Sequence, residues 1–210
     1  MRYLALAASA VLSLCASGAF AGDDAWKIDP VHSSANFSIR HMMVSNVKGG
    51  FEKVGGTVVY DGKNLKNAKV DATIEVASID TREAKRDEHL RTPEFFDVAK
   101  YPTITFKSKR VQQVKSGKFQ LVGDLTMHGV TKQVSLDVDG PTPAIKDPMG
   151  KQRMGASATA RLNRKDFGIS YNKLLDTGGA MLGDDVKVEI ELELIKEAPR
   201  QAEGAPGKAG

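Results

Sequence analysis

The chain has 210 residues, enough for one domain of ordinary size, and its charges are interspersed, with a net charge of +4. Because no basic block stands out, nucleic acid is excluded as an expected partner. The single cysteine, Cys15, lies near the start of the chain, so no thiolate chemistry is expected in the residues that follow.

Residues 1–21 have the pattern of a cleavable secretory signal peptide. Arg2 precedes an apolar run from Leu4 to Leu14, and the segment ends in Ala19-Phe20-Ala21. That run is too short to cross a bilayer as a helix. An alternative is lipidation at Cys15, but Leu14 stands before it, where such processing requires a small residue. We therefore expect cleavage after Ala21 and residence of residues 22–210 in the periplasm.

Residues 22–196 have the period-two alternation of strands with one buried face. The cleanest case is 186–194, where Val, Ile and Leu alternate with Lys and Glu. We expect about eight or nine strands in all, including 26–28, 35–39, 51–60, 70–76, 104–106, 118–127, 134–138 and 156–162. Turn signals at Asp61-Gly62, Ser116-Gly117 and 147–150 separate neighbours, which predicts an all-β antiparallel barrel closed on itself.

One segment interrupts this alternation. Residues 80–91 are rich in charge and carry Asp80 and Glu83 at capping spacing, which predicts a short helix. The helical segment leads into 92–97, where adjacent Phe95 and Phe96 cannot both face one side of a strand. We expect residues 80–97 to form a lid or plug. Residues 197–210, rich in Ala, Gly and Pro, are expected to be a disordered tail.

The size of the inward side chains decides whether such a barrel is filled or hollow. Ala156, Ala158 and Ala160 share one parity, and Ala72 and Gly123 are also small, so this wall would leave space if these residues face inward. A packed core with large residues opposite the alanines is an equally simple interpretation. A hollow would be apolar and elongated, which suits a lipid tail; its expected lining is Phe37, Ile39, Phe106, Leu125, Met127, Phe167, Ile190 and Leu192.

Few polar residues are candidates for a head group or for the rim of the barrel. We single out His32, Arg40 and His41, with Phe95 and Phe96 as capping residues. A hydrogen-bonded rim histidine is the plainer interpretation of His41, and a surface ion pair is that of Arg164. The four histidines are scattered, and His32-Ser33 has no third partner, so we expect no metal site, no cofactor and no catalytic residues.

Together these residues resemble the YceI-like, or polyisoprenoid-binding, family across 26–195. The motifs, in order along the chain, are Ile28–Ser33, Phe37–His41, Gly50-Phe51, Ser78–Thr81, Arg86–Leu90, Phe95–Asp97, Tyr101-Pro102, Thr105–Ser108, Gly123–Thr131, Asn163–Gly168 and Val186–Val188. The resemblance implies a lipocalin-like extended barrel whose long pore takes a polyisoprenoid chain or isoprenoid quinone as ligand. It also implies a bacterial periplasmic protein.

We therefore expect a carrier or sequestering protein for an isoprenoid lipid, with transient membrane contact and a homodimer as further expectations. The main alternative is a stress-related periplasmic barrel that acts through a protein partner and is filled incidentally by lipid. An enzyme acting on the lipid is the third reading, and the sequence offers no compact set of acid, base and nucleophile for it.

Overall fold

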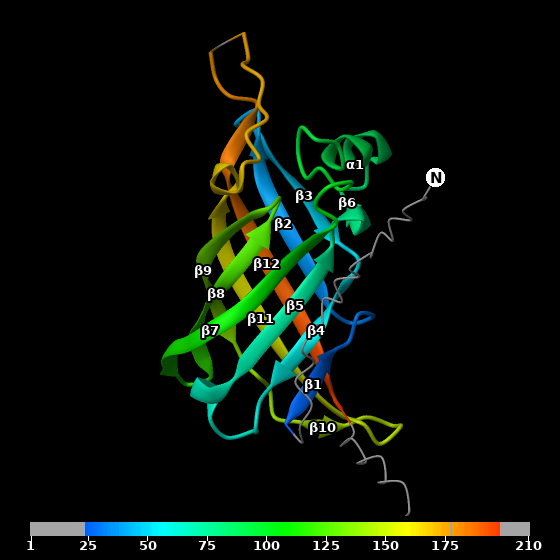
Figure 1. The fold of residues 1–210 in the computed structure, drawn as a ribbon, viewed down its shortest axis with the longest axis vertical. Helices are drawn as coiled ribbons and strands as arrows, with labels where there is room; N and C mark the ends of the chain where they lie inside the picture. The colour runs from blue at the N-terminus through cyan, green and yellow to red at the C-terminus, as the bar shows by residue number, and fades with distance from the viewer. Residues whose placement is uncertain (1–23, 177, 198–210) are drawn as a thin grey trace, which may run out of the picture.

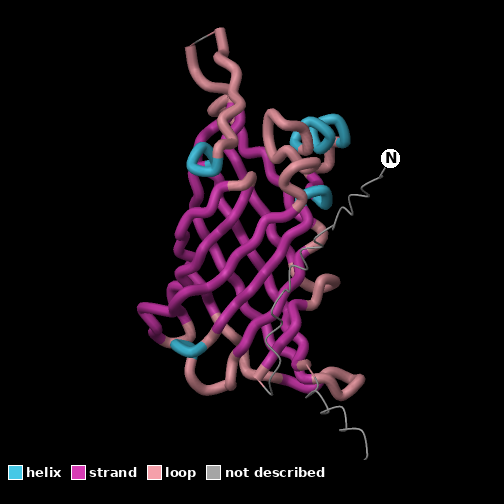
Figure 2. The backbone as a smooth tube through the Cα atoms, in the orientation of Figure 1, coloured by secondary structure: helices cyan, strands magenta, loops and turns pink. Residues whose placement is uncertain are grey.

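A computed structural model describes residues 24–176 and 178–197 of the chain, so the expected signal peptide and nearly all of the expected tail lie outside the described residues. The described part is a β-barrel (Figure 1, Figure 2). Its strands are β1 Ala25–Ile28, β2 Ser34–His41, β3 Ser45–Phe51, β4 Val54–Val59, β5 Lys69–Glu75, β6 Ile79–Asp80, β7 Thr103–Lys115, β8 Lys118–Met127, β9 Val130–Asp139, β10 Ile145–Lys146, β11 Gln152–Asn163 and β12 Leu182–Lys196.

Helices are few among the described residues. They are α1 Ala84–Leu90 and the short 3-10 turns η1 Leu65–Asn67, η2 Val76–Ser78 and η3 Arg164–Phe167. None of these is long and apolar enough to span a membrane as a helix. The all-β prediction is confirmed.

Pairing of β11 with β12 closes the barrel. The ring runs β11-β9-β8-β7-β5-β4-β1-β12 and back to β11, and each neighbouring pair in it is antiparallel. The ladder between β11 and β12 stays in register from Arg153↔Ile195 to Asn163↔Asp185. Closure leaves no strand of the ring with a free edge. A closed barrel was expected from the sequence for this reason.

On the side away from β11, β12 pairs with two shorter strands, β1 and β2. Near its end, Leu194 and Ile195 pair with β1, whereas the stretch from Leu182 to Glu191 pairs with β2. The expected strand 51–60 is shorter in the structure and is β4, Val54–Val59. Phe51 is instead the last residue of β3, because residues 52–53 are not in strand conformation. The hairpin of β2 with β3 was missed in the sequence, since Ser45–Gly50 shows no clear alternation.

Residues 81–102 lie at one end of the barrel, beside β3 and β6 (Figure 1), and we call them the covering segment. Its helix α1 is shorter than expected, and its N-cap is Glu83, whose carboxylate accepts hydrogen bonds from the backbone N–H of Lys85 and Arg86. Asp80 instead accepts from the N–H of Arg82. The predicted short helix is therefore present, with its N-cap three residues later than Asp80.

Candidate functional site

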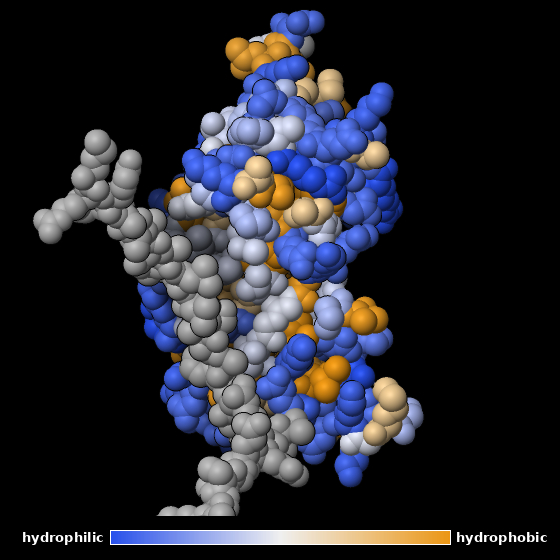
Figure 3. Space-filling model, turned by 45° about the vertical axis from the view of Figure 1, so that its right-hand side comes forward, coloured by the Kyte–Doolittle hydropathy of each residue, from blue (hydrophilic) through white to orange (hydrophobic). Residues whose placement is uncertain are grey.

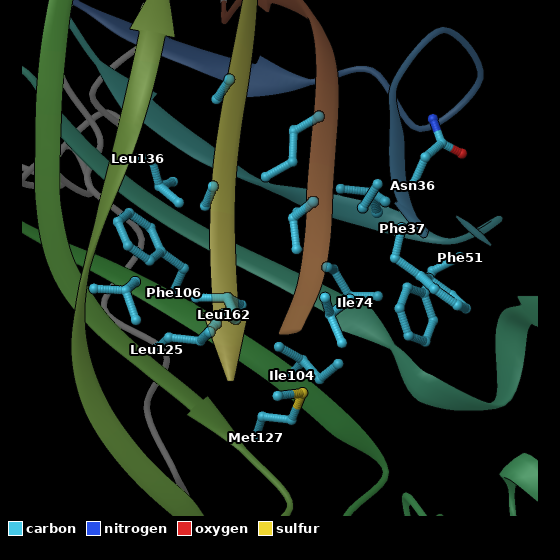
Figure 4. A pocket seen from close by; sticks show the side chains of 18 of the residues that line it. Asn36, Phe37, Phe51, Ile74, Ile104, Phe106, Leu125, Met127, Leu136 and Leu162 are labelled. Atoms are coloured by element: carbon cyan, nitrogen blue, oxygen red, sulfur yellow. The ribbon is translucent and has the colours of Figure 1, made fainter. Parts of the chain in front are cut away.

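An elongated apolar cavity of about 600 Å³ runs along the inside of the barrel. Side chains from β2, β4, β5, β7, β8, β9, β11 and β12 contribute to its wall (Figure 4). On β12 the lining residues are Leu182, Val186, Val188, Ile190, Leu192 and Leu194, while Lys187, Glu189 and Glu191 are exposed. At ~3.3 Å per residue, 182–194 spans roughly 40 Å along the strand, so the cavity suits a long chain.

Small side chains on β11 create this space. Ala156, Ala158 and Ala160 all line the cavity, so of the two interpretations left open by the sequence, the structure has the hollow one. Gly123 behaves differently from expectation. A Cβ there would lie 2.5 Å from the Phe106 ring, so Gly123 makes room for that ring and not for a ligand.

Seven of the eight side chains expected in the pore are on the cavity wall: Phe37, Ile39, Phe106, Leu125, Met127, Ile190 and Leu192. Phe167 is not among the lining residues. It lies in η3, where strand parity does not apply, and is only 2% exposed. Its carbonyl accepts a hydrogen bond from the ring of His128 at 3.1 Å. Phe167 is thus a packing residue of the turn that follows β11.

The cavity is packed shut at one end. Trp26, Ile28, Met154 and Leu194 form a cluster there with exposed fractions of 0–5%. Towards the other end, inward side chains such as Ile39, Met127 and Leu162 are partly exposed. We call this second end the mouth; it lies under the covering segment and the loop 169–181.

The residues expected at the rim do not all meet at the mouth. His41, Phe95 and Phe96 line the cavity, but His32 and Arg40 do not. His32 lies in the connection between β1 and β2, where its Nδ1 is 2.9 Å from a carboxylate oxygen of Asp29. Arg40 has the opposite parity to Ile39, and its guanidinium donates to the carbonyl of Met43 at 2.6 Å. Neither is therefore placed to meet a ligand inside the barrel.

The two adjacent phenylalanines fix the covering segment over the mouth by facing different partners. Phe96 packs edge-on against Phe51, with ring centroids 5.8 Å apart. Phe95 packs against Tyr171 of the loop 169–181 and against His89 of α1. Thr81 and Asp87 hold the start of the segment, because the Asp87 carboxylate accepts from both the N–H and the hydroxyl of Thr81.

Arg164, expected as half of a surface ion pair, is instead buried beside the mouth with 4% exposure. Its guanidinium donates to the carbonyls of Gly183, Ile169 and Tyr171 at 2.8–2.9 Å, and lies 3.4 Å from Asp184. Burial lowers its pKa, and the Asp184 carboxylate acts against that effect. Arg164 thus ties the first residues of the loop 169–181 to the start of β12. The sequence spacing did not indicate this role.

A charge network stabilises the closed end. Arg153 contacts the carboxylates of Asp29 at 2.8 Å, Asp147 at 2.7 Å and Glu193. Burial alone would raise the pKa of Asp29, but hydrogen bonds from His32, the Val31 N–H and Arg153 lower it to about 2. Asp29, His32 and Glu193 are close enough to hold a metal ion. The Arg153 guanidinium already bridges both carboxylates, however, and its positive charge opposes a cation there.

A match to the YceI-like domain covers residues 26–194, which is nearly the whole barrel. The chain belongs to the YceI-like family. A UPF0312 protein of Staphylococcus aureus strain N315 is 41% identical over 166 residues, which make up 79% of this chain and 94% of that protein.

Solved structures have the same YceI-like fold. The Campylobacter jejuni YCEI protein is 32% identical, with a TM-score of 0.64 over 75% of this chain and 90% of that one. A domain from Saccharophagus degradans, described as polyisoprenoid-binding and implicated in plant cell wall breakdown, has a TM-score of 0.61 and 15% identity. The match covers 82% of this chain and 98% of the Saccharophagus degradans chain. At 15% identity, it shows a similar fold only.

Proposed function

We propose that this YceI-like protein is a binding protein that holds the tail of a long isoprenoid lipid in its barrel and carries or sequesters it in the periplasm. One observation carries the proposal: the cavity is long, almost wholly apolar, packed shut at one end and covered by a segment at the other. The description of the Saccharophagus degradans domain as polyisoprenoid-binding supports the choice of ligand class.

The physical chemistry of the tail favours a carrier over a permanent store. Each buried CH₂ group is stabilised by ~0.8 kcal/mol relative to water, in the cavity as in a bilayer. Moving a tail from membrane to barrel therefore changes its free energy little, and the ordering of the chain opposes the move. A balance of this kind permits both loading and unloading.

Native mass spectrometry of the purified protein, followed by organic extraction and identification of the bound molecule, tests the proposal. We expect one discrete adduct that extracts as a polyprenyl or isoprenoid quinone species. The lipid-free protein should then take up the same species from vesicles. A barrel that purifies empty and stays empty beside such vesicles would refute the proposal and favour function through a protein partner.

A further inference from the structure

Four large apolar side chains are exposed at the mouth end of the barrel. They are Met42, Met43 and Val44 in the turn between β2 and β3, with 42%, 62% and 76% exposure, and Leu174 with 83% in the loop 169–181. We call these four residues the apolar tip. The loop 169–181 projects beyond the barrel at this end (Figure 1), and apolar surface is visible there in the space-filling view (Figure 3).

The turn that carries the methionines has a backbone conformation that is unfavourable for residues with a side chain. Met42 and Met43 have φ of 49° and 60°, and the Val44 N–H donates to the His41 carbonyl at 3.1 Å. Two consecutive positive φ angles in such a turn favour Asn-Gly, because a Cβ makes this conformation costly. Methionine at both positions therefore carries a conformational cost that Asn-Gly would avoid. This cost, together with the exposure of both side chains, indicates a role other than stabilising the fold.

The two parts of the apolar tip are joined and adjoin the cavity. The Met42 N–H donates to the Met181 carbonyl at 2.6 Å, and the Met181 N–H donates to the Lys173 carbonyl at 2.9 Å. His41 and Lys173, which precede the exposed residues in the chain, line the cavity, and so does Met181. The apolar tip is thus continuous with the mouth.

Basic residues border this surface. Arg40 is held against the Met43 carbonyl, and the exposed Lys173 precedes Leu174. Acidic residues nearby include Asp176 on the loop, Asp184, which pairs with Arg164 and Lys165, and the exposed Asp185 on β12. Exposed apolar side chains next to cations match the surface of a bilayer with anionic lipids, where basic side chains reach the head groups.

We propose that the apolar tip docks on a lipid bilayer and places the mouth where an isoprenoid tail can pass between membrane and cavity. This proposal rests on the proposed function, because docking serves the transfer of a lipid that the barrel binds. A long tail that crossed water would lose ~0.8 kcal/mol of stabilisation for each CH₂ group exposed, so transfer requires contact between mouth and membrane. The exposed Ile145 and Met149 lie in the loop around β10, away from the mouth, and provide a matched control.

The test is flotation with phosphatidylcholine vesicles that either contain or lack phosphatidylglycerol. The wild-type protein should bind, more strongly to the anionic vesicles. A Met42→Ser, Met43→Ser, Leu174→Ser variant should bind about tenfold more weakly or worse, because three apolar contacts with the bilayer are lost. An Ile145→Ser, Met149→Ser variant should bind as the wild type does. Equal binding by the tip variant would overturn docking through this surface.

A second measurement separates docking from misfolding and from self-association. In Met43→Trp, the added indole should shift its fluorescence to the blue on vesicles and be quenched by brominated lipid; an unchanged spectrum counts against docking. If light scattering shows a dimer that the tip variant abolishes, while neither protein floats, a second copy covers this surface and the membrane proposal fails.

Loading from detergent distinguishes the two proposals. The tip variant should bind a detergent-solubilised polyprenyl lipid as the wild type does, since its cavity is intact. Failure of both proteins to load, with vesicle binding preserved, would refute the proposed function and leave the docking surface standing.

Discussion

The ring of Phe95 lies 4.9 Å from the ring of Tyr171, inclined by 48°, and this contact joins the covering segment to the loop 169–181 above the mouth. We expect Tyr171→Ala to speed the release of bound lipid severalfold, because an aromatic contact of this kind is worth about 0.5–1.5 kcal/mol. Stopped-flow transfer of a fluorescent polyprenyl analogue to acceptor vesicles measures the rate. Ile145→Ala, which changes an exposed side chain on β10 away from the mouth, should leave it unchanged; equal effects would mean that the mouth does not limit release.

Filling the cavity should abolish binding without unfolding the barrel. Ala160 lines the cavity on β11, so Ala160→Phe places a ring where the tail would lie. We expect loss of the lipid adduct in native mass spectrometry and a change in the free energy of unfolding of less than about 2 kcal/mol. The control is Thr159→Phe, whose side chain is exposed on the outer face. Retention of lipid by Ala160→Phe would place the ligand elsewhere.

The charge network at the closed end predicts a dependence of stability on pH. The folded pKa of Asp29, about 2, lies below its ordinary value of 3.8, so the ionised carboxylate stabilises the fold fully above about pH 4. That contribution is lost as the pH falls from about 4 to about 2. Asp29→Asn should lower the free energy of unfolding by about 2 kcal/mol at neutral pH, and the difference from the wild type should shrink across that window.

Urea denaturation at a series of pH values measures this difference. Asp185→Asn changes an exposed carboxylate on β12 and should alter stability by less than about 0.5 kcal/mol. A gap between Asp29→Asn and the wild type that stays constant down to pH 2 would show that Asp29 does not stabilise the fold through its charge.

Arg164 should govern the order of the loop above the mouth. Arg164→Lys keeps the charge but cannot donate to the carbonyls of Ile169, Tyr171 and Gly183 together, so buried acceptors lose their partners. We expect a loss of about 2–4 kcal/mol and faster hydrogen exchange at residues 169–184. Lys165→Met breaks only the exposed pair with Asp184 and should cost less than about 1 kcal/mol. Unchanged exchange in Arg164→Lys would contradict this role.

Alternation along single strands was enough to predict the barrel and most of its wall. On β12 each apolar residue from Val186 to Leu192 faces the cavity and each charged one faces out, because the side-chain period of two leaves no other arrangement once one face is buried. The same rule placed Phe37 and Ile39 inward. It failed at Phe167, because η3 has no such period.

Alternation within one strand, in contrast, does not predict which side chains face that strand across the barrel. Whether Ala156, Ala158 and Ala160 face large residues or empty space depends on strands far away in the chain, and only the closed barrel decides it. The burial of Arg164 also depends on distant residues, since its acceptors in the loop 169–181 and at the start of β12 come together through the pairing of β11 with β12. The joining of Met42 to Met181 at the mouth likewise depends on the pairing of β2 with β12.

The sequence by itself thus determined the fold class, the inward and outward faces of the long strands and the presence of a covering segment, because these follow from local period and turn chemistry. The tertiary structure alone decided that the barrel is hollow, which end is shut and which polar residues meet at the mouth. Those properties arise from contacts between residues distant in sequence, and the pattern along one strand does not record its partners.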